Sequence, residues 1–356
     1  MYFTCLINHF KRLVSAITDH LPNTSAWAFS LALALTAITT NAAETQRPKG
    51  YYPLPSEGNM VGQSYTVMAT EEQTLLDIAR EHNVGYQEIR DANPEVSLWL
   101  PGEGTEVVIP ARHILPPVPR EGIVINLAEL RLYYYPRVSE GETPWVETYP
   151  IGIGREGYST PLGITTTTIK LKDPAWYPPR SMRREAAEQG EFVPGVVPPG
   201  PDNPLGKHAI LLDIPGYLLH GTNQPDGIGM RISRGCIRLY PEDIKSLFAR
   251  IPSGTPVNLV DIPIKIGWSN DELYVQSFRS LADQETGLDA MIATFEALQK
   301  AQKDRALDID YARLRKAMET TSGQVITLVP SAQDMTPAYQ LPKPPRNFFD
   351  EIALSS

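Results

Sequence analysis

Short apolar segments separated by turn residues fill the chain between positions 122 and 262, and this spacing limits the possible folds more than any other feature. The β-rich runs cover residues 123–127, 130–135, 146–151, 164–171, 209–213, 217–220 and 255–260. Strands this short and this regularly interrupted favour a sandwich or barrel over a parallel α/β sheet. One helix is expected near the end, where Pro241 suits a first helical turn. We therefore predict a mostly β domain over residues 122–262.

A smaller unit is predicted over residues 64–110. Tyr65–Met68 and Val107–Ile109 have the composition of strands, and the two helical patterns between them give the order βααβ. Residues 44–63 before it and 111–121 after it are rich in proline or in polar residues. Both segments are predicted to be linkers.

The chain continues beyond the β domain for almost a hundred residues. Helical patterns at about 286–303 and 311–320, with strands near 273–278 and 325–328, predict an α-rich extension over residues 263–329. Residues 330–356 are rich in proline and are expected to form a mobile tail. The sequence assigns no function to either part.

A long insertion, residues 173–206, interrupts the β domain. It contains too many prolines for a sheet, and only residues 181–189 have a helical pattern. Long loops in compact domains often form lids or binding walls. Trp176 and Tyr177 are therefore candidate substrate contacts, although simple packing of a surface loop explains them equally well.

The segment 217–239 carries the residues with the clearest chemical potential. His220 ends an apolar run, and Cys236 follows a glycine-containing loop that is able to fold back on it. A thiol attacks as its thiolate, and a nearby imidazole can take its proton. Backbone N–H groups at Gly235 and Cys236 could then stabilise an oxyanion. A buried structural cysteine is the alternative reading of the same pattern.

The motif around this cysteine resembles the active-site motif of the YkuD-like L,D-transpeptidases. That pattern is a histidine, a loop, Ser/Thr, a variable residue, glycine, cysteine, an apolar residue and Asn or Arg. The matching positions are His220, Ser233, Arg234, Gly235, Cys236, Ile237 and Arg238. Arg234 stands where many members carry a second histidine. The turn Thr160–Gly163 is also typical of that family.

The resemblance implies a reaction on peptidoglycan. Cys236 attacks the tetrapeptide stem, the terminal D-alanine leaves after protonation by His220, and an amine then attacks the thioester. The carbonyl of Gly221 is expected to orient the imidazole, and Ser233 to support the motif. Thr222, Arg234 and Arg238 are expected at the substrate, with a structural ion pair as the alternative for Arg238. No metal and no cofactor is needed.

The βααβ unit resembles a LysM domain. The N-P pair at Asn93 and the I-P pair at Ile109 are typical of that family. The resemblance implies binding of glycan strands that contain N-acetylglucosamine. A small domain that has no ligand is the alternative, because fold alone does not determine function.

The N-terminus has the pattern of an export signal over residues 1–43. Lys11 and Arg12 precede an apolar stretch at 26–40 that is shorter than a typical membrane span. Cleavage would remove Cys5 and leave Cys236 as the only thiol. We therefore expect an exported, periplasmic protein, with an uncleaved anchor as the alternative.

Several functions remain open at this point. The net charge of −9 argues against nucleic acid as a partner. Water as acceptor would make the protein an L,D-carboxypeptidase, and a catalytically dead domain would leave a LysM wall-binding scaffold. A papain-like endopeptidase is disfavoured because there the cysteine precedes the histidine. The acceptor amine belongs either to another peptidoglycan stem, giving a 3-3 cross-link, or to an outer-membrane lipoprotein.

Overall fold

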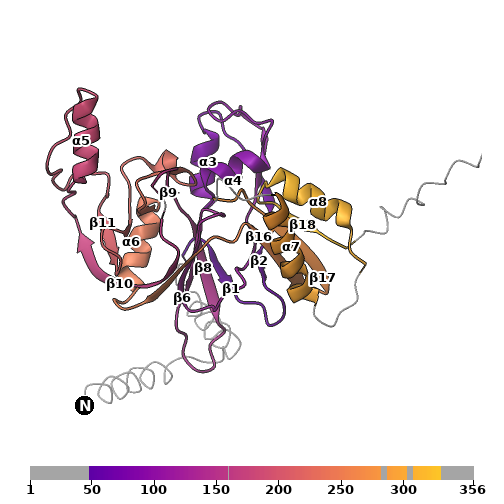
Figure 1. Cartoon of the computed structure of the whole chain (residues 1–356). Helices are drawn as coiled ribbons and strands as arrows, with labels where there is room; N and C mark the ends of the chain where they lie inside the picture. The colour runs from indigo at the N-terminus through magenta and orange to yellow at the C-terminus, as the bar shows by residue number, and fades with distance from the viewer. Residues whose placement is uncertain (1–47, 159, 282–286, 303–307, 330–356) are drawn as a thin grey trace, which may run out of the picture. The chain divides into compact units, whose positions relative to one another are not determined.

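The computed structural model describes residues 48–158, 160–281, 287–302 and 308–329 (Figure 1). The predicted leader, residues 1–43, and the predicted tail, residues 330–356, lie outside the described residues. No helix within the described ranges has the length and apolar character needed to cross a membrane.

A nine-stranded sheet forms the centre of the β domain, with strand order β1-β8-β7-β6-β15-β10-β11-β12-β14. Its strands are β1 (Tyr51–Pro53), β6 (Gly122–Asn126), β7 (Arg131–Tyr135), β8 (Trp145–Pro150), β10 (Gly163–Lys172), β11 (His208–Leu212), β12 (Leu218–His220), β14 (Ile237–Arg238) and β15 (Pro256–Val260). The pairs β6–β15 and β12–β14 are parallel, and the other six are antiparallel. The prediction of a mostly β domain is confirmed.

Helix α6 (Pro241–Arg250) packs against this sheet. Pro241 occupies its first turn, where the missing N–H costs nothing, and Glu242 complements the positive end of the helix dipole. Ile244 and Leu247 are buried in a core that also contains residues of β6, β8, β11, β12, β14 and β15. The sheet therefore buries this core together with α6, and β14 is the strand at one edge of the sheet.

The βααβ unit has the predicted order. Strands β3 (Tyr65–Met68) and β4 (Glu106–Ile109) pair antiparallel, and helices α3 (Leu75–Glu81) and α4 (Tyr86–Ala92) lie between them in sequence. This unit, called the βααβ domain below, has a core of its own that includes Leu75, Ile89 and Val107.

The two predicted linkers are wrong in part, because both contain strands. Strand β1 extends the edge of the central sheet beside β8, and β2 (Met60–Gly62) pairs with β5 (Arg112–Ile114). Each strand has three residues and a partner far along the chain. Such pairings leave no periodic signal, so the sequence analysis missed them.

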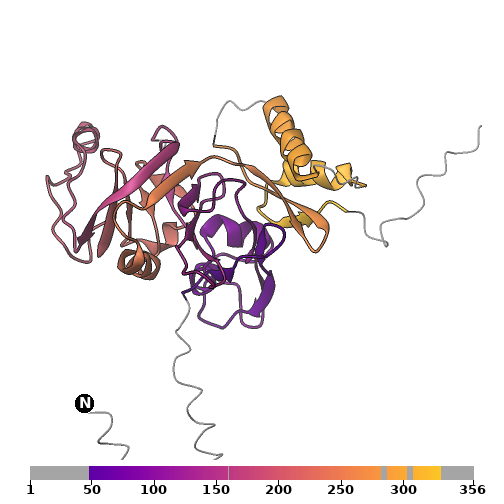
Figure 2. The same ribbon diagram turned by 90° about the horizontal axis from the view of Figure 1, so that it is seen from below.

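The extension over residues 263–329 contains the two predicted helices and the two predicted strands, together with one further strand, β16. Strands β16 (Ile264–Ser269), β17 (Glu272–Ser277) and β18 (Val325–Thr327) form a sheet, and helices α7 (Gly287–Gln302) and α8 (Tyr311–Thr320) contact it (Figure 2).

Two short strands, β9 (Ile153–Gly154) and β13 (Arg231–Ser233), form a separate parallel pair. The insertion carries one helix, α5 (Arg180–Glu188), as predicted.

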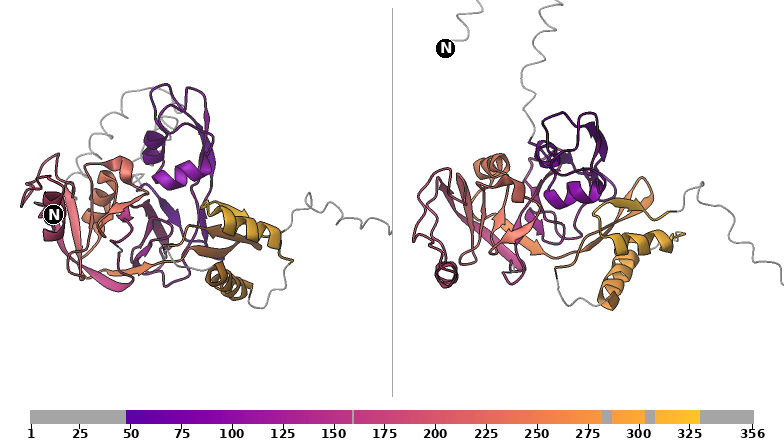
Figure 3. Two further views of the ribbon diagram at one scale, coloured as in Figure 1. Left: turned by 45° about the horizontal axis from the view of Figure 1, so that its top comes forward. Right: turned by 90° about the horizontal axis from the view of Figure 1, so that it is seen from above.

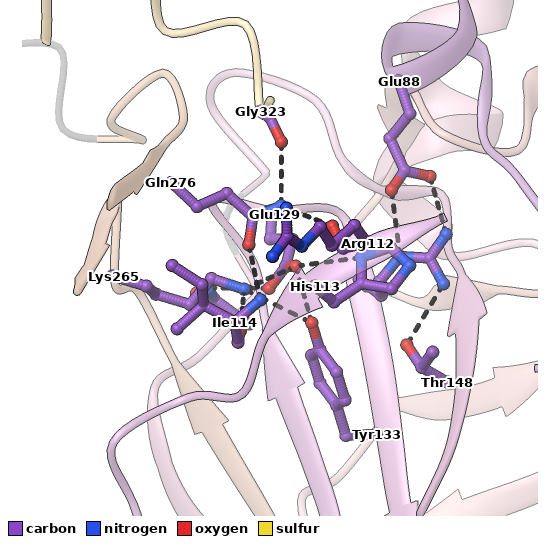
Figure 4. A network of polar contacts seen from close by, with 12 residues as sticks. Glu88, Arg112, His113, Ile114, Glu129, Tyr133, Thr148, Lys265, Gln276 and Gly323 are labelled. Carbon is purple, nitrogen blue, oxygen red and sulfur yellow. Dashed lines mark hydrogen bonds and ion pairs between the residues drawn. The ribbon is translucent and has the colours of Figure 1, made fainter. Parts of the chain in front are cut away.

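A buried polar network joins the extension to the β domain (Figure 4). Lys265 of β16 is fully buried, and its Nζ donates to Glu129 Oε1 at 2.6 Å and to Ile114 O at 2.5 Å. Tyr133 OH donates to the same carboxylate at 2.6 Å. His113 Nδ1 lies 4.0 Å from Glu129, but burial holds the pKa of this histidine well below its usual value, so the ring is neutral.

Candidate active site

The parallel pair β12–β14 brings three candidate residues near one another. His220 is the register partner of Arg238, and paired residues of neighbouring strands point to the same side. Cys236 lies directly before β14, and the charge of Arg238 acts on both its thiol and the His220 ring. The loop between the two strands, residues 221–235, is called the catalytic loop below. It returns the chain to β12, as the sequence predicts.

His220 is buried and has one oriented ring nitrogen. Its Nδ1–H donates to the carbonyl oxygen of Gly221 at 2.6 Å, which is the contact expected from the family resemblance. Burial is the main cause that lowers the pKa of His220 to about 3, the positive charge of Arg238 adds to this, and the Gly221 carbonyl opposes it. The ring is therefore neutral, and Nε2 is free of a proton and can act as a base.

Cys236 is half-buried and unpaired. Its Sγ lies 3.4 Å from the carbonyl oxygen of Gly216, to which the thiol donates. Burial raises the pKa of this thiol, while a hydrogen bond from the Leu218 backbone and the charge of Arg238 act in the opposite direction. No hydrogen bond joins Cys236 to His220 among the described residues, so the two groups rest as a neutral thiol and a neutral imidazole.

Arg238 lies close enough to affect both groups. Its side chain is half-buried, and its Nε is a buried nitrogen with no hydrogen-bond partner in the described part of the chain. Burial lowers the pKa of the guanidinium, and the Cys236 thiol counteracts this effect. Buried polar groups are normally satisfied, so this donor is an exception within the described residues.

The tight turn before the cysteine is held by three polar contacts. Gly235 has a φ of +105°, which disfavours other residues. Its N–H donates to Ser233 Oγ at 3.1 Å, and that hydroxyl donates to the carbonyl of Cys236 at 2.6 Å. Thr160 Oγ1 donates to the Gly235 carbonyl at 2.9 Å. The Gly235 N–H, which we expected to face an oxyanion, therefore already has an acceptor.

Arg234 connects the motif to the insertion instead of standing free for substrate. Its Nη2 donates to Glu185 Oε2 of α5 at 2.5 Å, and its Nη1 donates to Tyr158 OH at 2.9 Å. Tyr158 OH donates in turn to Glu185 Oε1 at 2.8 Å. These hydrogen bonds lower the pKa of Glu185 to about 2. We call the three residues the α5 latch.

The remaining predicted contacts have partners other than the thiol, or none, among the described residues. Thr222 is buried, and its hydroxyl accepts the Gln224 N–H at 2.9 Å. Trp176 is held by two backbone hydrogen bonds to Val197 inside the insertion, whereas Tyr177 is 72% exposed. Within the described part of the chain, none of these three residues is hydrogen-bonded to the thiol or the imidazole.

The sequence analysis did not single out Glu185, Tyr158 or Thr160 as individual residues. Glu185 is 49 positions from Arg234, and Thr160 is 75 positions from Gly235. No local pattern connects positions so far apart. The turn that contains Thr160 was recognised only through the family resemblance.

Taken together, the geometry provides the parts of acyl transfer through a cysteine. A thiol, an unprotonated imidazole nitrogen and an unsatisfied guanidinium donor come from the strand pair β12–β14 and the residue before β14. Nucleophile, base and a donor for developing negative charge are the groups that such chemistry needs.

Comparison with known proteins agrees with this geometry. Residues 120–259 match the family model of the L,D-transpeptidase catalytic domain, YkuD. The chain is 39% identical over 293 residues to "Probable L,D-transpeptidase ErfK/SrfK" of Escherichia coli strain K12, covering 80% of this chain and 92% of that protein. It is 40% identical over 283 residues to "Probable L,D-transpeptidase YcfS" of the same organism, covering 77% and 87% of the two chains.

Among solved structures, the catalytic domain of an E. faecium L,D-transpeptidase aligns with a TM-score of 0.30 and 21% identity. The alignment covers 41% of this chain and 100% of that domain. The assignment rests on the sequence relatives, which are similar over most of their length. The chain belongs to the L,D-transpeptidase family and is an L,D-transpeptidase.

Proposed function

We propose that this enzyme acts on peptidoglycan in the periplasm and transfers a stem peptide through a thioester on Cys236. The register pair of His220 and Arg238, with Cys236 directly before β14, is the observation that carries the proposal. The names of the relatives support the reaction class, and the peptidoglycan substrate follows from that class.

In the first half-reaction, His220 Nε2 takes the thiol proton and the Cys236 sulfur attacks the carbonyl carbon before the terminal D-alanine. The C–N bond breaks, the D-alanine amine receives the proton from His220, and a thioester remains. The Gly221 carbonyl keeps the Nδ1 proton in place and so directs Nε2 to the sulfur.

In the second half-reaction, an acceptor amine attacks the thioester and passes a proton to His220. The new amide forms and the Cys236 thiolate leaves, to be reprotonated by the imidazole. No external energy source is required, because one amide bond is exchanged for another. We propose the Cys236 backbone N–H as an oxyanion donor, since the N–H of Gly235 is engaged by Ser233.

Arg238 is proposed to meet a carboxylate of the stem peptide. Its unpartnered Nε supports this role over the alternative of a structural ion pair. Arg234 is proposed to act through the α5 latch rather than by touching substrate. Trp176 and Tyr177 remain proposed contacts on the insertion, without a placement near the thiol.

The βααβ domain is proposed to be a LysM domain that binds glycan strands. Its order of elements and the N-P pair at Asn93 support this assignment; the Asn93 amide bonds both Ile89 O and Val108 O and joins α4 to β4. An exported protein with a cleaved leader fits this wall-directed role.

Incubation of the purified protein with disaccharide tetrapeptide tests the function. Transfer gives cross-linked dimers and free D-alanine. Release of tripeptide alone would make the enzyme a carboxypeptidase, and unchanged substrate would leave a binding scaffold. Addition of a lysine-ending peptide as a competing amine shows whether the acceptor is a stem peptide or a lipoprotein terminus.

A further inference from the structure

The first turn of α4 in the βααβ domain lies against the middle of the catalytic loop. Tyr86 N–H donates to Ile228 O at 2.9 Å, and Gln87 N–H donates to Gly229 O at 3.3 Å. These amides are among those that a helix start leaves without a partner, and Gly85 offers no side chain to cap them. Carbonyl oxygens of the catalytic loop therefore accept the hydrogen bonds that the first N–H groups of α4 cannot make within the helix.

The two backbones meet without space for side chains. A Cβ on Gly229 would lie 2.3 Å from Tyr86 N and 2.6 Å from Gly85 Cα, and the φ of Gly229 is +87°. A Cβ on Gly85 would lie 2.9 Å from Gly229 Cα. Only glycine permits this approach at both positions, so the contact depends on the residue types present.

The same stretch of the catalytic loop leads directly to the cysteine. Gly229 N–H donates to Ile151 O at 3.2 Å, and Ile153 N–H donates to Met230 O at 3.0 Å. Strand β13 then ends at Ser233, whose hydroxyl holds the carbonyl of Cys236. A backbone shift at Ile228 and Gly229 would therefore move the sulfur of Cys236, because hydrogen bonds hold the residues between them.

Helix α4 is itself fixed to the β domain. Glu88 Oε2 accepts the Gly85 N–H at 2.8 Å, and the same carboxylate pairs with the fully buried Arg131 of β7 through two bonds of 2.9 Å. Figure 4 shows Glu88 pointing from its helix toward the network around Thr148. Arg80 of α3 forms a bidentate pair with Glu242 of α6 at 2.9 Å.

We propose that the βααβ domain is a positioning element of the active site, in addition to any glycan binding. Its α4 holds the catalytic loop at Ile228 and Gly229, and these hydrogen bonds fix the distance between Cys236 and His220. Figure 3 shows the βααβ domain, in indigo and violet, beside the orange segments of the β domain. A domain that served only as a tether would affect binding to polymeric peptidoglycan and leave turnover of a small peptide unchanged. The proposal rests on the transfer activity proposed above.

The test removes one hydrogen bond at the contact and keeps the helix. Tyr86→Pro deletes the N–H that meets Ile228 O, and proline is favoured at this first helical position. Gly85 already has the extended conformation that a residue before proline adopts, with φ −89° and ψ 166°. Tyr86→Ala is the matched control, because it loses the same side chain but keeps the N–H.

The substrate is a tetrapeptide stem that carries no sugar, so glycan binding does not contribute. We expect the kcat of Tyr86→Pro to fall at least about tenfold relative to Tyr86→Ala, because small misplacements of reacting groups have large effects on rate. Circular dichroism and the Tm show whether each variant is folded. If Tyr86→Pro does not fold, Gln87→Pro against Gln87→Ala repeats the comparison at the second hydrogen bond.

Equal kcat values for a folded proline variant and its alanine control would overturn the proposal. This result is separate from failure of the proposed function, in which the unmodified protein itself releases no D-alanine from the peptide.

Discussion

At the scale of single residues, burial keeps both proposed reacting groups, Cys236 and His220, neutral. The thiol of Cys236 has a raised pKa, and the imidazole of His220 has a pKa of about 3. A thiolate–imidazolium ion pair between Cys236 and His220 is therefore disfavoured before substrate binds. Arg238 is the one charge identified as acting on both, and it favours the thiolate while disfavouring the imidazolium. The sequence singled out all three residues as candidates, but it did not show that one guanidinium acts on both Cys236 and His220.

Arg238→Gln tests this electrostatic role. Loss of the charge raises the pKa of Cys236 further, so alkylation by iodoacetamide at pH 8 is expected to slow by about threefold to tenfold. The rate should rise toward alkaline pH in both proteins, with the variant profile displaced to higher pH. Arg231→Gln, an exposed arginine of the same loop, is the control. Superimposable profiles for Arg238→Gln and the unmodified protein would contradict the assigned role.

Asp243 gives a second prediction at this scale. Burial raises the pKa of this carboxyl to about 8, and its Oδ2 has no hydrogen-bond partner among the described residues. Between the unfolded pKa near 4 and the folded value, the native state binds a proton that the unfolded chain releases, so stability falls as pH rises through this window. Asp243→Asn should therefore raise the free energy of unfolding at pH 8 by ~1–3 kcal/mol and leave it nearly unchanged at pH 4.

Urea unfolding at the two pH values measures the effect. The exposed Asp213→Asn variant should show no such difference between pH 4 and pH 8. A stability of Asp243→Asn that changes with pH in parallel with the unmodified protein would show that Asp243 is ionised in the native state.

At the scale of elements, the sequence predicted those with a periodic or turn-bounded pattern. The strand pair that presents His220, the helix after Pro241 and the βααβ order all follow from local signals. Strands β1, β2 and β5 were missed because each is three residues long and is stabilised by a distant partner. The α5 latch was missed for the same reason, since its residues come from three separate segments.

The α5 latch predicts a measurable role for Glu185. Glu185→Gln removes the ion pair with Arg234 and should loosen the insertion, so trypsin should cut at Arg183 or Arg184 several times faster than in the unmodified protein. The KM of Glu185→Gln for the tetrapeptide should also rise. Glu188→Gln is the control, because Glu188 belongs to the same helix and meets only the exposed Arg184 among described ion pairs. Equal cutting rates in the two variants would show that the latch does not hold α5.

At the scale of the whole molecule, the described residues from 48 onward belong to one compact unit. Carbonyl oxygens of the catalytic loop accept hydrogen bonds from the first turn of α4 in the βααβ domain. The buried Lys265 of the C-terminal extension donates to Glu129 of the β domain. Composition suggested separate domains joined by linkers. The domains are instead joined by contacts of individual residues. The amino-acid composition of a segment cannot reveal such contacts.

Lys265 provides the prediction at this scale. Lys265→Ala leaves the carboxylate of Glu129 buried without its ion-pair partner and should lower the free energy of unfolding by ~3–5 kcal/mol. The double variant Lys265→Met with Glu129→Gln should recover part of this loss, because no buried charge remains unpaired. Urea denaturation measures both, with the surface variant Lys207→Ala as control. A loss below about 1 kcal/mol for Lys265→Ala would show that the carboxylate reaches water or another cation.

The intact mass of the protein after brief mixing with disaccharide tetrapeptide tests the central claim most directly. The account predicts an adduct with the mass of the donor less D-alanine, present in the unmodified protein and absent in Cys236→Ala. An adduct of the same mass on Cys236→Ala would contradict it, as would turnover by that variant at the rate of the unmodified protein.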